Sequence, residues 1–112
     1  VAGAIAALLA GNYMAMTGSE LSDESVAAAG RQLRASTSVQ DLLARLSPPD
    51  RRRLYEQCAM LGTFMALAHK TTPQQPANVV ANLRQSAREN LRVVLGDAAD
   101  TLRFTTTGLQ LR

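Results

Sequence analysis

The sequence contains one cysteine, one histidine and no tryptophan, and these shortages exclude several kinds of site. A single cysteine cannot form an intrachain disulfide or a cysteine-cluster zinc site. A single histidine rules out metal sites built from several histidines. The sequence also lacks the glycine-rich phosphate loops, nucleophile elbows and metalloprotease helix motifs that mark common enzymes. We therefore expect neither a metal ion nor a cofactor.

Aromatic residues are scarce as well, at 4% of the chain, and this argues against an aromatic-rich β-sandwich. The apolar residues are mostly alanine, leucine, valine and methionine, a composition that favours helices. Apolar residues make up 46% and charged residues 19% of the 112 positions, the balance of a globular protein rather than a disordered one. The sequence thus predicts one all-α domain over residues 1–112, a compact bundle of about five helices with a short extended or hairpin-like C-terminal tail.

The first segment, Val1–Met16, carries no charge and is apolar nearly all round, so we expect a helix that its neighbours cover on several sides. Gly3, Ala7, Gly11 and Ala15 recur every four residues along it. Small side chains at this spacing form a smooth groove in which another helix can approach closely. The apolar run is interrupted and is shorter than the roughly 20 residues needed to cross a bilayer, so we predict a core helix and no transmembrane span.

Serines and prolines divide the rest of the chain into further helices. A serine can accept hydrogen bonds from first-turn amides, and proline fits the first helical positions. Ser22, Ser38 and Ser47 stand at such starts, with two prolines after the third. The predicted helices are about Asp23–Ala35, Val39–Leu46, Pro48–His69 and Pro76–Leu95, the last of them ended by Gly96.

The predicted helix Pro48–His69 is the longest and has the widest apolar face, so we expect it to be the central helix. One apolar stripe consists of Leu54, Cys58, Leu61, Met65 and Ala68. A second stripe beside it consists of Tyr55, Ala59, Gly62 and Ala66. In the short helix before it, we expect a buried side made of Leu42, Leu43 and Leu46.

The C-terminal tail, residues 97–112, changes character. Leu102 and Phe104 alternate with polar residues, and so do Leu109 and Leu111. Three threonines before Gly108 indicate a turn between these two runs. The pattern is typical of a two-stranded hairpin, which must lie against the helices because an isolated hairpin is marginally stable. Residues 70–78, with two prolines, predict a linker.

Cys58 and His69 are the only candidates for nucleophilic catalysis. They lie eleven residues apart on one predicted helix. That is about 16 Å along the axis, whereas a nucleophile and its base need contact at about 3 Å. We therefore expect Cys58 to pack in the core and His69 to occupy the last helical turn, where a partly charged imidazole suits the helix dipole. We expect the acidic pairs at 23/24 and 97/100 to cap helices or turns.

The charge of the chain is uneven. Residues 1–50 have three arginines against five acidic residues, a net charge of −2. Residues 51–112 have eight arginines and one lysine against four acidic residues, a net charge of +5. A basic half of this kind is compatible with an anionic partner.

The candidate partner-binding residues are six arginines: Arg51, Arg52, Arg53, Arg84, Arg88 and Arg92. The first three begin the long helix, where cations oppose the helix dipole. The other three are like charges at four-residue spacing, which repel one another. A partner's acidic surface, or an acid of the chain itself such as Glu56 or Glu89, would offset these costs. A solvated arginine face is the alternative interpretation.

Three segments resemble a family of bacterial helical domains of unknown function that occur in exported proteins: Ala4–Tyr13 (AIAALLAGNY), Leu54–Ala66 (LYEQCAMLGTFMA) and Leu95–Leu109 (LGDAADTLRFTTTGL). Such domains usually follow a signal peptide and a low-complexity linker, so the resemblance implies a precursor that extends upstream of Val1. It implies a periplasmic or secreted location, with a cytoplasmic one left open. It assigns no activity and no functional residues.

From these observations we expect a non-enzymatic domain that binds a protein partner through a helix surface. That surface is the arginine face or an uncovered part of the small-residue groove in residues 1–16, and the groove would alternatively close a homodimer. Binding of nucleic acid or another polyanion through the arginine-rich second half is the main alternative, although the few aromatic residues are scattered rather than placed beside the basic positions. An enzyme of unrecognised type, marked by a pocket of convergent polar groups, is the third class.

Overall fold

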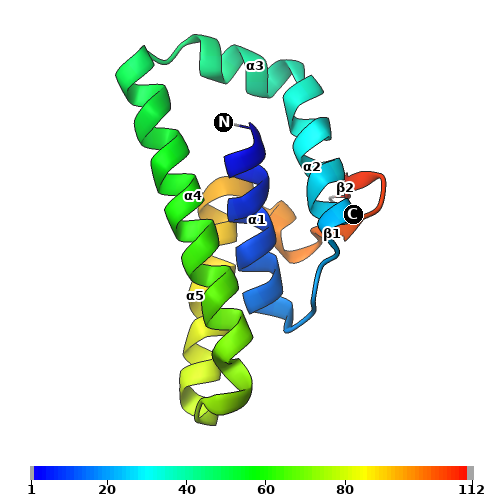
Figure 1. Ribbon diagram of the computed structural model, residues 1–112, viewed down its shortest axis with the longest axis vertical. Coiled ribbons are helices and arrows are strands. Elements are labelled where there is room, and N and C mark those ends of the chain that lie inside the picture. Colours follow the sequence, from blue (N-terminus) through cyan, green and yellow to red (C-terminus); the bar gives the residue numbers. More distant parts are fainter. Residues whose placement is uncertain (1, 111–112) are drawn as a thin grey trace.

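The computed structural model describes residues 2–110, which fold into five α-helices and a small hairpin (Figure 1). The α-helices are α1 (Ala2–Thr17), α2 (Asp23–Ala35), α3 (Thr37–Ala44), α4 (Pro48–Thr71) and α5 (Ala77–Leu95). Two 3₁₀ helices follow α4 and α5, namely η1 (Thr72–Gln74) and η2 (Gly96–Asp100). The hairpin consists of β1 (Arg103–Thr105) and β2 (Gly108–Gln110). The predicted all-α bundle with a hairpin-like tail is therefore confirmed.

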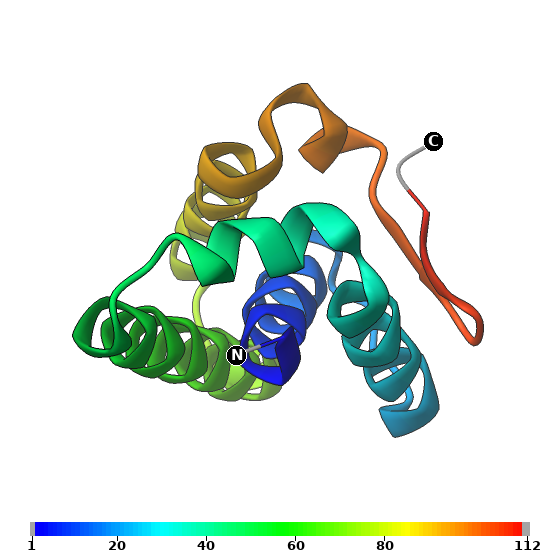
Figure 2. The ribbon, with the colours of Figure 1, turned by 90° about the horizontal axis from the view of Figure 1, so that it is seen from above.

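Helix α1 is the centre of the molecule, and α2, α4 and α5 pack around it (Figure 2). Because α1 has no charged side chain, it can bury nearly its whole surface without desolvating an ion. Leu9 in α1 and Leu91 in α5 are among the largest fully buried side chains, and they share one cluster with Ala99 and Leu102. The expectation that α4 is the central helix is wrong, because α4 lies at the edge and buries only one face.

The small residues of α1 allow α4 to cross it closely. A Cβ atom added at Gly11 would collide with the carbonyl oxygen of Gly62, and one added at Gly62 would lie 2.6 Å from the carbonyl oxygen of Ala7. Both helices therefore need glycine where they meet. The predicted close approach along the small-residue groove is confirmed, and α4 occupies most of that groove, although a Cβ atom added at Gly3 would have no neighbour within 4 Å.

One polar side chain is fully enclosed in the core. Asn12 of α1 donates from Nδ2 to the carbonyl oxygen of Leu8 at 2.8 Å. Its Oδ1 accepts from Nδ2 of Asn90 in α5, at 2.9 Å. Burial of an amide is tolerated when its hydrogen bonds are made, so Asn12 fixes the position of α5 on α1 rather than weakening the core.

The helix starts follow the serine caps, with one difference. Ser22 and Ser47 accept from the backbone N–H groups of Ser25 and Asp50, as predicted. The cap of α3 is Ser36 rather than the predicted Ser38, because the Ser36 side chain accepts from the N–H of Val39 while its backbone is still extended. Helix α3 therefore begins two residues earlier, at Thr37.

Helix α3 crosses from the end of α2 to the start of α4 and buries none of its side chains completely (Figure 1). The predicted buried side of this helix is wrong. Leu42 is exposed, and Leu43 and Leu46 are only partly covered. The described contacts of α3 include its Ser36 cap and a hydrogen bond from Nε2 of Gln40 to the carbonyl oxygen of Arg34 at the end of α2.

The C-terminal hairpin lies against α2, as an unsupported hairpin of three-residue strands could not persist alone. Gly96 ends α5 with a φ of 62°, and Gly108 opens β2 with a φ of 134°, so both glycines occupy backbone conformations that other residues rarely adopt. The rings of Tyr13 and Phe104 are 5.2 Å apart and join the hairpin to α1. Among residues 2–110 no helix has the length and hydropathy to cross a membrane.

Candidate functional site

Cys58 and His69 both lie on the buried face of α4 and serve separate purposes. Burial raises the pKa of the Cys58 thiol, which keeps it protonated and a poor nucleophile. The Nε2 atom of His69 lies 2.9 Å from Oε1 of Glu20, in the segment between α1 and α2. Because eleven residues of α-helix separate Cys58 from His69 by about 16 Å, the pair does not form a dyad.

The acidic residues of the two pairs named in the sequence analysis have different structural roles. Asp23 and Glu24 lie in the first turn of α2, where the dipole favours anions, as predicted. The expectation that Asp100 caps a turn is wrong, because its carboxylate pairs with two arginines. Within residues 2–110 no cluster of three or more histidine, cysteine, aspartate or glutamate side chains could hold a metal ion.

Two of the three arginines of α5 are partly neutralised by an acid of the same chain. Arg88 lies 3.0 Å from Oδ1 of Asp100, and Arg92 lies 3.0 Å from Oδ2 of the same carboxylate. Hydrogen bonds from Arg92 and Arg88 hold the pKa of Asp100 below its ordinary value. The acid that offsets these charges is thus Asp100, rather than Glu56 or Glu89 as considered from the sequence.

The other arginines take no part in these ion pairs. Arg84 lies one turn earlier in α5, where it lines a shallow hollow with Arg88 and Asp100 and lies close to Gly18, just after α1. Arg51, Arg52 and Arg53 are exposed in the first turns of α4, far from the start of α5 (Figure 1). Arg53 reaches Asp50 at 3.5 Å. The structure therefore brings the six candidate arginines to two separate places, not to one basic surface.

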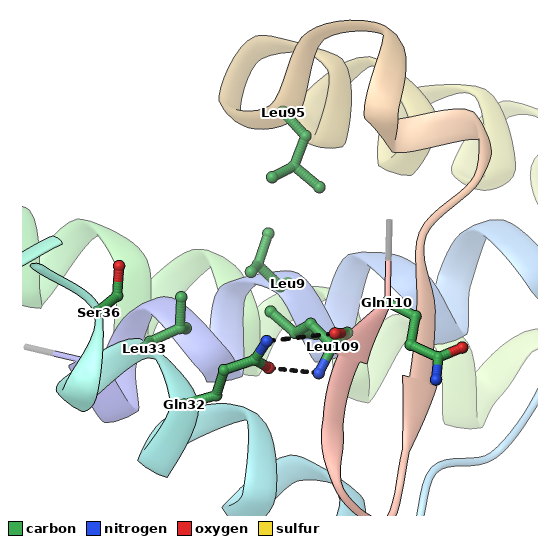
Figure 3. A pocket seen from close by; sticks show the side chains of 7 residues that line it. All are labelled: Leu9, Gln32, Leu33, Ser36, Leu95, Leu109 and Gln110. Atoms are coloured by element: carbon green, nitrogen blue, oxygen red, sulfur yellow. Dashed lines mark hydrogen bonds between the residues drawn. The ribbon is translucent and has the colours of Figure 1, made fainter. Parts of the chain in front are cut away.

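A hollow of about 610 Å³ lies between the end of α2, the end of α5 and the hairpin (Figure 3). Its lining consists of Leu9, Gln32, Leu33, Ser36, Leu95, Leu109 and Gln110. Gln32 donates to the carbonyl oxygen of Leu109 at 3.2 Å and accepts from the N–H of the same residue, so its amide pairs with β2 as a neighbouring strand would. Ser36 caps α3. The amide of Gln32 and the hydroxyl of Ser36 therefore hold the fold together, and the third polar side chain of the lining is that of Gln110.

The most unusual surface is the outer side of α4. Met60, Phe64 and Leu67 are 71%, 64% and 58% exposed, and they follow one another at spacings of four and three residues. Together with Ala59 and Thr63 they line a shallow depression. We call these five residues the outer apolar face. No charged residue occurs in α4 between positions 57 and 68, so the face is continuous.

The two apolar stripes predicted from the sequence do not include this surface, although the sequence of α4 contains a pattern that indicates it. The helix carries apolar residues around more of its circumference than one neighbouring helix can cover. Met60, Phe64 and Leu67 belong to neither stripe, and their helical positions lie opposite the buried Cys58 and Met65. A third apolar row on a helix at the edge of the molecule is thus left exposed to solvent.

The whole chain, residues 1–112, matches the model of a family of unknown function (DUF6683). No curated protein matches the chain, and no solved structure does.

Proposed function

We propose that this chain, which belongs to the DUF6683 family of unknown function, is a non-enzymatic domain that binds a protein through the outer apolar face of α4. The observation that carries the proposal is the row of three large apolar side chains, each more than half exposed, on one side of one helix. The four- and three-residue spacing is the one with which a helix presents side chains to a hydrophobic groove or to a second helix.

The energetics favour a covered state of this face. Removing a methionine, phenylalanine or leucine side chain from water contributes roughly 1.5–3 kcal/mol when burial is complete. Contiguous exposed apolar patches that are bordered by polar residues mark interaction sites, whereas single exposed apolar residues are common and carry no such meaning. Glu56 and Lys70 border the outer apolar face along the helix and supply the polar rim that such interfaces have.

The chemistry of the titratable groups supports a non-enzymatic role. Within residues 2–110, burial among apolar side chains raises the pKa of Cys58, and hydrogen bonds from Arg92 and Arg88 lower the pKa of Asp100. Neither lies in the hollow beside the hairpin. Catalytic groups with shifted pKa values usually converge on one pocket. Here Cys58 lies in a buried apolar cluster, whereas Asp100 lines a separate hollow beside Arg84 and Arg88.

The alternative expected from the sequence, polyanion binding through the arginines, has less support. Asp100 already neutralises part of the charge of Arg88 and Arg92, and Arg51–Arg53 lie elsewhere. A phosphate backbone that binds Arg88 and Arg92 would have to share their guanidinium groups with Asp100, and the negative charge of that carboxylate weakens its attraction.

The proposal is tested by placing a photo-crosslinking amino acid at position 64 and, as a matched control, at position 93 of α5. Val93 is an apolar side chain that is 87% exposed and lies outside the outer apolar face. We expect position 64 to crosslink to one defined protein, and position 93 to give no such product. A second copy of this chain counts as such a protein.

The captured protein is then purified, and its binding is measured by calorimetry with the Phe64→Ser and Val93→Ser variants. We expect the first substitution to weaken binding at least tenfold and the second to leave it unchanged. Equal crosslinking at both positions, or equal binding by both variants, would contradict the proposed function.

A further inference from the structure

We infer that the partner of the outer apolar face is the same face of a second copy, with the two α4 helices antiparallel about a two-fold axis near Thr63. This inference rests on the proposed function and names its partner. Helix α4 forms one edge of the molecule, and of the elements within residues 2–110 none lies over its outer side (Figures 1 and 2). A second α4 can therefore approach along its whole length.

The apolar row is nearly symmetric about this axis. Met60 and Leu67 lie on either side of Thr63, seven residues and about 10 Å apart along the helix. In the antiparallel pair, Met60 of each copy lies beside Leu67 of the second copy. The two Phe64 rings meet near the axis, at the middle of the interface. An isologous contact has this symmetry: if one residue of the first copy contacts a second residue of the other copy, the reverse contact also forms.

Charged residues at both ends of the face fit the same arrangement. Glu56 and Lys70 each lie seven residues from Thr63, so all three positions fall on one side of the helix. The axis places Glu56 of one copy opposite Lys70 of the second copy, and the reverse pair forms at the other end. Neither side chain has an ion pair within residues 2–110, so both are available to a partner.

The charges also select the antiparallel direction. A parallel pair in register would place the two Glu56 side chains together and the two Lys70 side chains together, and like charges across an interface are strongly unfavourable. In the antiparallel pair, the positions opposite Arg51–Arg53 lie beyond the end of α4 at Thr71, and residues 72–76, which follow α4, carry no charge.

The size of the outer apolar face determines how strongly we expect the two copies to bind. Three large apolar side chains per copy cover less area than the roughly 800 Å² per partner of a standard interface. The dimer should therefore be weak, with a dissociation constant in the micromolar to sub-millimolar range. It will be visible only when the protein concentration spans that range.

The test is analytical ultracentrifugation of the full chain from about 5 µM to about 1 mM. We expect a reversible monomer–dimer equilibrium. Phe64→Ser should raise the dissociation constant at least tenfold, and the matched Val93→Ser should not change it. Circular dichroism will show that both exposed-site variants remain folded.

Charge reversal identifies the partner residues. Glu56→Lys alone and Lys70→Glu alone should each raise the dissociation constant about tenfold, because each change places like charges opposite each other at both ends. The double variant E56K/K70E restores the opposite charges and should dimerise like the unchanged chain. An equimolar mixture of the two single variants should form heterodimers for the same reason.

A chain that stays monomeric at 1 mM would overturn the inference, and so would single charge reversals without effect or a double variant that is not rescued. The proposed function would survive such results if position 64 still crosslinked to a different protein. It would fail separately if positions 64 and 93 gave the same crosslinks.

Discussion

Gly62 is the residue on which the contact between α1 and α4 most depends. An added Cβ would lie within 2.8 Å of three backbone atoms of Ala7 and Leu8, and backbone atoms cannot move aside as a flexible side chain can. The sequence shows a glycine in the middle of a helix, which costs roughly 1 kcal/mol relative to alanine. In the structure, the close packing of α1 against α4 at Gly62 offsets that cost.

We predict that Gly62→Ala lowers the free energy of unfolding by roughly 2 kcal/mol, because the steric cost of separating the helices exceeds the gain in helix propensity. Gly3→Ala is the matched control. Gly3 lies in α1 as well, but no atom lies within 4 Å of its added Cβ, so we expect about 0.5 kcal/mol of stabilisation. Urea unfolding followed by circular dichroism measures both, and similar effects of the two substitutions would contradict the assigned crossing.

At the scale of elements, Asp100 joins the end of η2 to α5. Its two carboxylate oxygens bind Arg88 and Arg92, which lie one turn apart on α5. This arrangement relieves the repulsion between two arginines at four-residue spacing. It also holds η2 against α5, so that the chain turns toward the hairpin after Gly96.

The lowered pKa of Asp100 makes a pH prediction. A carboxyl group whose pKa is lower in the folded state stabilises the fold above its unfolded pKa, and this contribution is lost as the pH falls through the folded pKa. We expect Asp100→Asn to reduce stability slightly at pH 7. This difference should shrink as the pH falls through the folded pKa of Asp100 and vanish once the carboxyl is protonated in both states.

The measurement for Asp100 is urea unfolding of the unchanged chain and the variant at pH 7 and at low pH. Asp97→Asn is the control, because Asp97 belongs to the same 3₁₀ helix and has no ion pair within residues 2–110. A stability difference for Asp100→Asn that stays constant across the pH range would contradict the role of the ion pairs.

The helix starts show which features of an element can be predicted from the neighbouring residues alone. Ser22 and Ser47 cap their helices as predicted, because a cap depends on a few neighbouring residues. Ser36 and Ser38 both precede an apolar run, and the local sequence does not distinguish them. The structure selects Ser36, the residue at which α2 ends and α3 begins.

At the scale of the whole molecule, the packing around α1 predicts a gradient of stability. Residues in the middle of α1, such as Leu9 and Asn12, are almost completely enclosed by three other helices, whereas α3 buries no side chain. Amide hydrogens exchange through local opening, which is easiest where few apolar contacts are lost.

We therefore predict that hydrogen exchange is slowest in the middle of α1 and fastest, among the five α-helices, in α3. Exchange followed by nuclear magnetic resonance or mass spectrometry at neutral pH gives the order directly. Equal protection of α1 and α3 would show that α3 is held by contacts other than those described.

The sequence by itself determined the helical class, the approximate helix limits, the covered position of α1 and the hairpin at the end, because each depends on local propensity and on the apolar pattern of one segment. Only the tertiary structure decided that α4 lies at the edge, that Asp100 pairs with Arg88 and Arg92, and that Met60, Phe64 and Leu67 face outward. An apolar pattern shows that a side chain favours burial, but which neighbour covers it depends on segments far apart in the chain. For that reason the shortage of cysteine, histidine and aromatic residues could exclude sites, whereas the outer apolar face of α4 emerged only once the helices were packed.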